Sequence, residues 1–200
     1  MSQPTNDPIG AHLKLSLSAL ERANGDAALL ANARKIAAVL IAALRTGNKI
    51  LLIGNGGSAA DAQHIAAEIM GRYKQDRPGW AAIALTTDTS ALTAVANDYG
   101  FEQVFARQVE GLGKPGDVLL AFSTSGRSPN ILAALHKARE GGLVTIGFTG
   151  IKGEALGSHC DHLFVSPSDD TPVVQQIHLT IAHGICDEIE QTLMREATRK

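Results

Sequence analysis

The sequence predicts an α/β protein, a three-layer α/β/α sandwich with a five-stranded parallel sheet and extra N-terminal helices. Five short apolar runs, each bounded by turn-forming residues, indicate the strands, at 49–53, 81–85, 118–122, 143–148 and 162–165. Because the runs are continuously apolar rather than alternating, they are typical of parallel strands that are covered on both faces. Helical stretches separate the runs, and this alternation predicts right-handed crossovers between the strands.

The helices follow in order along the chain. Residues 9–46 carry apolar side chains at helical spacing and predict two helices, the second ending at Gly47 and Asn48. Three further helices are expected between the strands, at 58–73, 90–96 and 129–140, and a last long one at 172–194.

Length and composition indicate a single domain with an aliphatic core. The chain has 200 residues, of which 44% are hydrophobic, 19% charged and only 4% aromatic, which excludes wholesale disorder. We expect one domain at 9–195, which includes the N-terminal helices. A flexible N-terminus at 1–8 and a C-terminal tail at 196–200 flank it.

Charge and cysteine content exclude several classes of protein. A net charge of −2 argues against a polycationic nucleic-acid binder. No stretch approaches about 20 uninterrupted apolar residues, so no membrane span is expected. The polar N-terminus lacks the features of a secretion signal, and two cysteines cannot form a disulfide framework. We therefore expect a cytoplasmic protein.

Two loops of small residues each follow a predicted strand and open a helix. The first is Gly54–Ser58 and the second is Ser123–Ser128. In the second loop, Ser128 is a good N-cap and Pro129 suits the first helical position, so hydroxyls and free backbone N–H groups meet at a helix N-terminus. One such loop is often an ordinary connection, but two at equivalent points of one sheet favour an anion site beyond the strand ends.

Nucleotide-binding loops fit this sequence poorly. A nucleoside-triphosphate loop needs a lysine, and none follows either loop. A dinucleotide fingerprint needs a third glycine where Ala59 stands, and Asp88 lies too far along the chain for its acidic residue. No nucleotide cofactor is therefore expected.

Ionisable residues gather on two of the predicted helices. His64 and Glu68 are four residues apart and share a helix face, while Gln175 and His183 on the last helix can reach one cavity. A carboxylate and an imidazole suit general acid–base catalysis, and the same nitrogen and oxygen donors suit a zinc site. The alternative is an ordinary helix pair at 64 and 68, although the apolar neighbours of His183 imply a partner for its imidazole.

Two other histidine positions are weaker candidates. For His178 we favour a surface or interface position. The cluster His159–His162 resembles a metal site, but it enters the last strand, where successive side chains point to opposite faces. We expect it to be structural or exposed to solvent.

Several of these motifs together resemble one enzyme family. Residues 54–64, GNGGSAADAQH, with Glu68 following, closely resemble the first loop and helix of phosphoheptose isomerases, members of the sugar-isomerase (SIS) superfamily. Further similar segments are Leu85–Asp88, Asn97–Gly100, Ser123–Gly126 and the helix that carries Gln175 and His183. The resemblance runs in order from about residue 47 to 190.

The resemblance implies the SIS fold and the isomerisation of sedoheptulose 7-phosphate to D-glycero-D-manno-heptose 7-phosphate. In bacteria this reaction is the first step towards nucleotide-activated heptose for lipopolysaccharide, capsule or surface-layer glycan, and the sequence leaves the destination open. The family is usually a homotetramer with active sites at subunit interfaces. The resemblance also implies one zinc ion per subunit.

The resemblance further implies roles for individual residues. The substrate phosphate would be held by Ser123, Thr124, Ser125 and Ser128. The rest of the substrate would meet Asn55, Gly56, Gly57, Asn97, Asp98 and Gln175. The metal ligands would be His64, Glu68, Gln175 and His183, with Glu68 and His183 also the catalytic acid–base residues.

Some points stay open at the level of sequence. A carboxylate bound tightly to zinc is a poorer base, so either Glu68 alternates between its two roles or the metal is mainly structural. The family commonly has Gln-Glu where this chain has Gln175-Gln176, and the loop 166–172 varies among members.

Two rival functions remain within the same fold. One is a non-catalytic SIS protein that binds the bacterial replication initiator protein, which would need no acid–base pair. The other is a phosphosugar-sensing regulator, which would normally carry an added DNA-binding domain. Retention of His64, Glu68 and His183 together favours the enzyme.

Overall fold

Five parallel strands form one sheet in the order β2-β1-β3-β4-β5. The computed structural model describes residues 7–198. The strands are β1 (Ile50–Gly54), β2 (Ala82–Ala84), β3 (Val118–Phe122), β4 (Val144–Gly150) and β5 (His162–Ser166). Each neighbouring pair is parallel, which confirms the predicted sheet.

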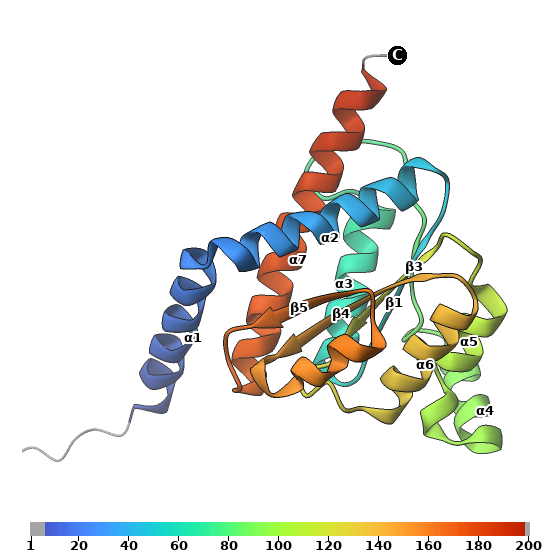
Figure 1. Cartoon of the computed structure of the whole chain (residues 1–200), viewed down its shortest axis with the longest axis horizontal. Helices are drawn as coiled ribbons and strands as arrows, with labels where there is room; N and C mark the ends of the chain where they lie inside the picture. Colours follow the sequence, from blue (N-terminus) through green and yellow to red (C-terminus); the bar gives the residue numbers. More distant parts are fainter. Residues whose placement is uncertain (1–6, 199–200) are drawn as a thin grey trace, which may run out of the picture.

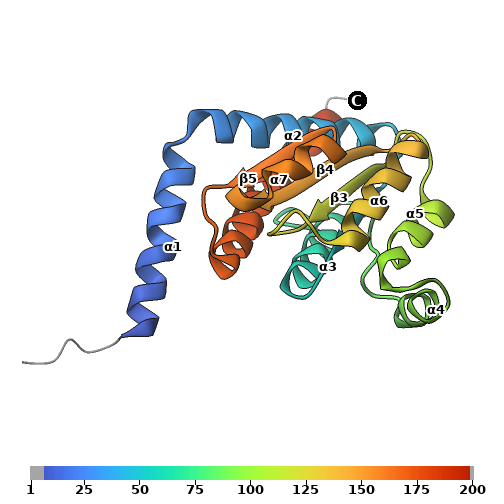
Figure 2. The same ribbon diagram turned by 60° about the horizontal axis from the view of Figure 1, so that its bottom comes forward.

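Helices cover both faces of the sheet and complete the predicted three-layer sandwich (Figures 1 and 2). They are α1 (Pro8–Gly25), α2 (Ala27–Arg45), α3 (Gly57–Met70), α4 (Thr89–Tyr99), α5 (Ala106–Leu112), α6 (Pro129–Glu140) and α7 (Thr171–Ala197). Two 3₁₀ segments, η1 (Phe101–Gln103) and η2 (Ile151–His159), lie between them. The seven-residue helix α5 and both 3₁₀ segments were not predicted, because they are too short to show a clear period.

The apolar strands divide their side chains between two cores. On β1, Ile50 and Leu52 pack with α2, α3 and α7, whereas Leu51 and Ile53 pack with α5 and α6. Every residue of β1 and β3 is buried. The continuously apolar pattern of these strands therefore reflects burial on both faces.

The chain ends differ in detail from the predicted boundaries. Asp7 caps α1 and Pro8 is its first residue, while residues 1–6 lie outside the described part of the chain. At the other end, α7 continues to Ala197, and residues 199–200 are not described.

Helix α2 is, by length and composition, apolar enough to cross a membrane. In this structure one of its faces packs against α7 and the sheet, burying Ile36, Leu40 and Ile41. The amide of Asn32 also donates a hydrogen bond to the Leu163 carbonyl of β5 at 2.6 Å. Helix α2 therefore packs one apolar face on the core and leaves the rest of its surface partly or fully exposed.

A buried ion pair ties the end of α3 to α7. The carboxylate of Glu190, fully buried on α7, accepts hydrogen bonds from the backbone N–H groups of Tyr73, Lys74 and Gln75 and from Arg77 Nε. Arg77 in turn donates to the carbonyls of Glu68, at 2.9 Å, and of further residues at the end of α3. These bonds explain why α3 ends at Met70 rather than at the predicted residue 73.

The same contacts keep Glu190 ionised. Burial opposes its charge, but the three N–H donors and the Arg77 guanidinium outweigh this effect and lower the pKa of Glu190 below its ordinary value.

His178 is a correction to the sequence interpretation. Instead of lying at the surface, its side chain is fully buried among Phe122, Phe148 and Phe164. Its Nε2 donates to the Thr149 carbonyl at 3.2 Å, and its Nδ1 has no partner. Burial lowers the pKa of His178 to about 4, and the hydrogen bond to Thr149 only partly opposes this.

We predict that Glu190→Ala lowers the free energy of unfolding by about 3–5 kcal/mol, because it leaves the buried Arg77 charge unpaired. Urea denaturation at fixed protein concentration measures the effect. Glu110→Ala is the matched control, since the Glu110–Arg107 ion pair is about half exposed, and it should change stability little. Equal losses in the two variants would contradict the importance of the buried pair.

We also predict a pH-dependent contribution from His178. In the unfolded chain this imidazole titrates near its ordinary pKa of about 6.5. Between that pH and the folded pKa of about 4, the unfolded chain binds a proton that the folded chain does not. Stability from this group is therefore complete above about pH 6.5 and falls by up to about 1.4 kcal/mol per pH unit on acidification.

Denaturant titrations from pH 7 to pH 4.5 measure this slope. His178→Gln keeps a donor for the Thr149 carbonyl but cannot titrate, so its slope should be shallower than that of the unmodified chain. His136→Gln, whose side chain is exposed on α6, should keep the original slope. An unchanged slope in His178→Gln would refute the assignment.

Candidate functional site

The two small-residue loops meet where the strand order reverses. β1 and β3 are neighbours in the sheet, with Gly54 opposite Phe122, but the chain leaves β1 for α3 on one face and β3 for α6 on the other. Ligands of such sheets bind at this switch point, beyond the carboxyl ends of the strands. A pocket of about 300 Å³ lies there, lined by Asn55, Gly56, Gly57, Ser58, Phe122, Ser123, Thr124, Ser125, Ser128, Thr171 and Gln175.

The second loop offers hydroxyls that the protein itself leaves unused. Ser123 Oγ is buried without a hydrogen-bond partner, and Ser128 caps α6 by position without a side-chain capping bond. Both residues line the pocket, and Ser128 is at the N-terminus of α6, where the helix dipole favours an anion. A phosphate would supply the acceptors that these groups lack.

Two glycines let the backbone come close at this pocket. Gly126 has φ +64°, and a Cβ there would lie 2.5 Å from the Gly153 carbonyl oxygen. A Cβ at Gly57 would lie 2.7 Å from Nε2 of Gln175, so this glycine allows α7 to bring its amide to the start of α3. Gln175 thus forms part of the wall of this pocket.

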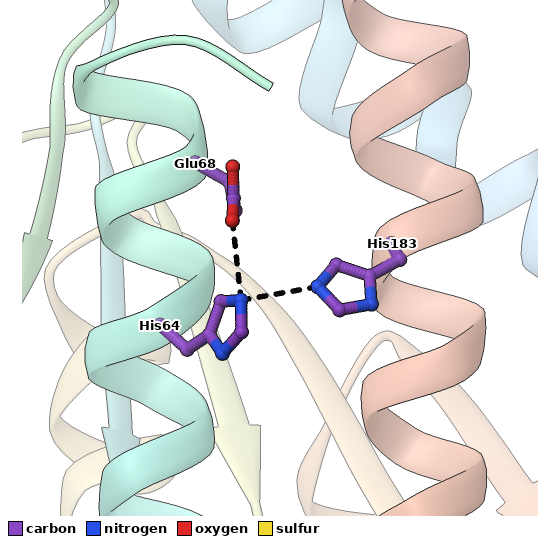
Figure 3. A group of neighbouring side chains, drawn as sticks. All are labelled: His64, Glu68 and His183. Carbon is purple, nitrogen blue, oxygen red and sulfur yellow. Dashed lines mark hydrogen bonds and ion pairs between the residues drawn. The ribbon is translucent and has the colours of Figure 1, made fainter. Parts of the chain in front are cut away.

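Three further side chains converge between α3 and α7 (Figure 3). His64 Nε2 lies 3.1 Å from Glu68 Oε1 and 3.1 Å from His183 Nε2. Tyr73 stacks on the His183 ring, with ring centroids 5.7 Å apart. Burial, and then the neighbouring His64, lower the pKa of His183, and Glu68 opposes this shift.

The cluster has the donor set of a metal site. The single in-plane position of His64 Nε2, whether a hydrogen or a lone pair, cannot serve both Glu68 Oε1 and His183 Nε2 with good geometry, and a shared cation would satisfy all three atoms. The three donor atoms lie within 4.8 Å of one another, and no other such group occurs in residues 7–198. Two imidazole nitrogens and a carboxylate oxygen suit zinc with an open coordination position.

Other predicted site residues lie elsewhere on this chain. Asn97 and Asp98 are exposed on α4, bonded to each other at 2.8 Å, and do not line the pocket. Gln176, the departure from the family pattern, faces α1 and contacts His12 at 3.2 Å.

The His159–His162 segment does not converge on a common point. His159 is exposed and Cys160 is buried. The carboxylate of Asp161 accepts hydrogen bonds from the N–H and hydroxyl of Thr145, which fixes the start of β5 against β4. These contacts are structural.

The structure adds three residues that sequence reasoning missed. Thr171 lines the pocket from the first turn of α7, and its hydroxyl before Pro172 repeats the Ser128-Pro129 signal. Tyr73 and Asn130 carry no comparable signal, because stacking and amide pairing depend on segments far apart in sequence.

Comparisons with known proteins agree with this geometry. Residues 18–150 match the SIS domain family. A phosphoheptose isomerase from Bradyrhizobium sp. (strain BTAi1) is 67% identical over 98% of this chain and 99% of that protein. Another from Bradyrhizobium sp. (strain ORS 278) is 68% identical over 98% of this chain and 100% of that protein.

Solved structures give the same result. A phosphoheptose isomerase from Neisseria gonorrhoeae superposes with a TM-score of 0.85 at 41% identity, covering 92% of this chain and 97% of that chain. One from Francisella tularensis gives a TM-score of 0.87 at 37% identity, covering 94% and 100%. The chain therefore belongs to the SIS domain family and, within it, to the phosphoheptose isomerases.

Proposed function

We propose that this chain is an aldose–ketose isomerase that converts sedoheptulose 7-phosphate to D-glycero-D-manno-heptose 7-phosphate. Relatives named phosphoheptose isomerase are up to 68% identical over nearly its whole length. The observation that carries the proposal is that α3 and α7 contribute to both the anion pocket and the His64–Glu68–His183 cluster. Helix geometry puts these two places about one substrate length apart.

The separation follows from the two helices that contribute to both places. Gly57 at the pocket and His64 in the cluster are seven residues apart on α3, and Gln175 and His183 are eight residues apart on α7. At about 1.5 Å per residue these spacings correspond to roughly 10–12 Å along each axis. An extended chain advances roughly 1.2 Å per bond, so the bonds from C1 to the phosphorus of a heptose 7-phosphate span a similar length.

The phosphate end is proposed to bind the second loop. Ser123, Thr124, Ser125 and Ser128 would hold it, supported by the unused hydroxyls and the α6 N-terminus. Asn55, Gly56, Gly57 and Gln175 line the same pocket and would contact the adjoining part of the sugar.

The reacting end is proposed to lie at the cluster. Glu68 removes the proton from C1 of the open-chain ketose and returns it to C2, which forms and then resolves an enediol. His183 takes the proton from the C1 hydroxyl and delivers one to the C2 oxygen, so that no proton is gained or lost overall. Burial and the neighbouring His64 lower the pKa of His183, which favours the neutral imidazole that accepts a proton.

A zinc ion held by His64, Glu68 and His183 would polarise the sugar oxygens. Gln175, the fourth ligand that the resemblance implies, instead lies against Gly57 in the anion pocket. The three converging donors support the zinc assignment. The chain's own contribution is to hold these side chains on two helices that are tied together at Glu190.

We further propose a homotetramer with active sites at subunit interfaces. Asn97 and Asp98 are exposed on α4, a helix with no buried residue, so a neighbouring subunit could receive them at its sugar site. The proposed setting is the cytoplasm, where the product would feed nucleotide-activated heptose for cell-envelope polysaccharide. A purely protein-binding role would not require the convergence of His64, Glu68 and His183.

We predict that the purified chain converts sedoheptulose 7-phosphate and that Glu68→Gln lowers kcat by about 10²–10⁴-fold, because it removes the carbon base. Product formation is followed chromatographically, and binding by calorimetry. Binding of the sugar phosphate should change little, since the phosphate pocket is distant from residue 68. Glu188→Gln, on an exposed part of α7, is the control.

Metal analysis with and without a chelator completes this experiment. Loss of activity with an unchanged melting temperature supports a catalytic metal, whereas a parallel loss of both supports a structural one. Near-normal turnover of Glu68→Gln would remove this carboxylate from the mechanism, and absence of conversion by the unmodified chain would refute the proposed function.

We also predict that Ser123→Ala weakens binding of inorganic phosphate and of the sugar phosphate by about tenfold, the effect of one lost hydrogen bond to a charged group. Unfolding free energy should not fall, because this hydroxyl has no partner within the protein. Ser158→Ala, which loses only an exposed bond to the Ala155 carbonyl, should leave binding unchanged. Full-strength phosphate binding by Ser123→Ala would place the anion elsewhere.

A further inference from the structure

A reciprocal amide pair joins the two loops of the pocket. Asn55 Nδ2 donates to Asn130 Oδ1 at 2.9 Å, and Asn130 Nδ2 donates to Asn55 Oδ1 at 2.8 Å. Asn55 follows β1, whereas Asn130 is the second residue of α6, 75 residues later. Asn130 is only 2% exposed, so its side chain is committed to this contact.

The pair removes the rotational freedom of the Asn55 amide. Each amide has two N–H donors and an oxygen with two lone pairs, and the terminal torsion of an unpaired asparagine is broad. The two hydrogen bonds run in opposite directions between the amides. They fix the plane of the Asn55 amide and determine on which side its oxygen and its nitrogen lie. One N–H and one lone pair of Asn55 remain available to a ligand, in a defined direction.

The position of the Asn55–Asn130 pair indicates which ligand the free groups of Asn55 would meet. Asn55 lines the anion pocket and also a neighbouring pocket of about 330 Å³. Asn130 lines only the neighbouring one, together with Phe101, Glu102 and Pro129. Asn130 therefore supports Asn55 from behind, on the side away from the anion.

We propose that Asn130 is a positioning residue for the sugar, which acts by holding Asn55 in the orientation that meets the substrate beyond its phosphate. The inference rests on the proposed function, because it needs a substrate larger than phosphate in the pocket. Asn130 makes no contact with the substrate itself. Asn55 and Ser128 line both pockets and so lie between them, and the sugar chain extends instead towards the cluster between α3 and α7.

The test compares a sugar phosphate with inorganic phosphate in the full-length chain. Asn130→Ala, and Asn130→Leu as a nearly isosteric variant without hydrogen bonds, should raise KM for sedoheptulose 7-phosphate about tenfold, the effect of a weakened polar contact. The Kd of inorganic phosphate, measured by calorimetry, should stay within about twofold, since the loop hydroxyls bind it. Asn32→Ala, which loses a helix-to-sheet hydrogen bond far from the pocket, is the matched control and should change neither value.

A double-mutant cycle separates positioning from a general structural role. If Asn130 acts through Asn55, then Asn130→Ala should cause no further loss of kcat/KM in an Asn55→Ala background. Additive losses, or a parallel weakening of inorganic phosphate binding, would overturn the proposal. If the unmodified chain does not convert the sugar, the proposed function is wrong. The role of Asn130 is then decided by calorimetry, which compares the affinities of the unmodified chain and of Asn130→Ala for the sugar phosphate and for inorganic phosphate.

Discussion

The buried contact between Arg77 and Glu190 fixes the relation between the two helices that carry the reactive side chains. Arg77 donates to the carbonyl of Glu68 itself, and Glu190 lies two turns beyond His183 on α7. The contact between Arg77 and Glu190 thus holds the Glu68 carboxylate and the His183 imidazole in a fixed position relative to each other. Because both partners of the ion pair are almost completely buried, this link has little freedom to shift. A cluster that must hold three donors within 4.8 Å needs such a link.

The phosphate end depends on a different constraint, the reversal of strand order between β1 and β3. The reversal sends the chain to opposite faces of the sheet and leaves two helix N-termini at one edge. Small residues then allow close backbone approach, as at Gly126, and the amide pair of Asn55 and Asn130 locks the two loops together. Helices α3 and α7 extend from this pocket to the cluster, so one pair of helices sets the distance between the two ends of the site.

Sequence patterns predicted the local features and missed those that depend on distant segments. The apolar run 118–122 and the Ser-Pro signal before 129–140 gave β3 and α6 with their observed bounds, because propensity and capping are local. The four-residue spacing of His64 and Glu68 likewise placed both on one face of α3. Strand order, the contact between Arg77 and Glu190 across 113 residues, and the burial of His178 have no local signature. The local sequence around a single histidine among apolar residues does not distinguish a buried helix face from an exposed one.

The edges of the sheet have a consequence for the behaviour of the chain at high concentration. β2, at one edge, is only three residues long, and β5, at the other, gives its Leu163 carbonyl to the Asn32 side chain of α2. Exposed strand edges are the usual templates on which foreign chains add and aggregate. One edge here is too short to recruit a strand, and the other is partly occupied by a helix. The protein thus combines a largely apolar parallel sheet with protection against edge-to-edge aggregation.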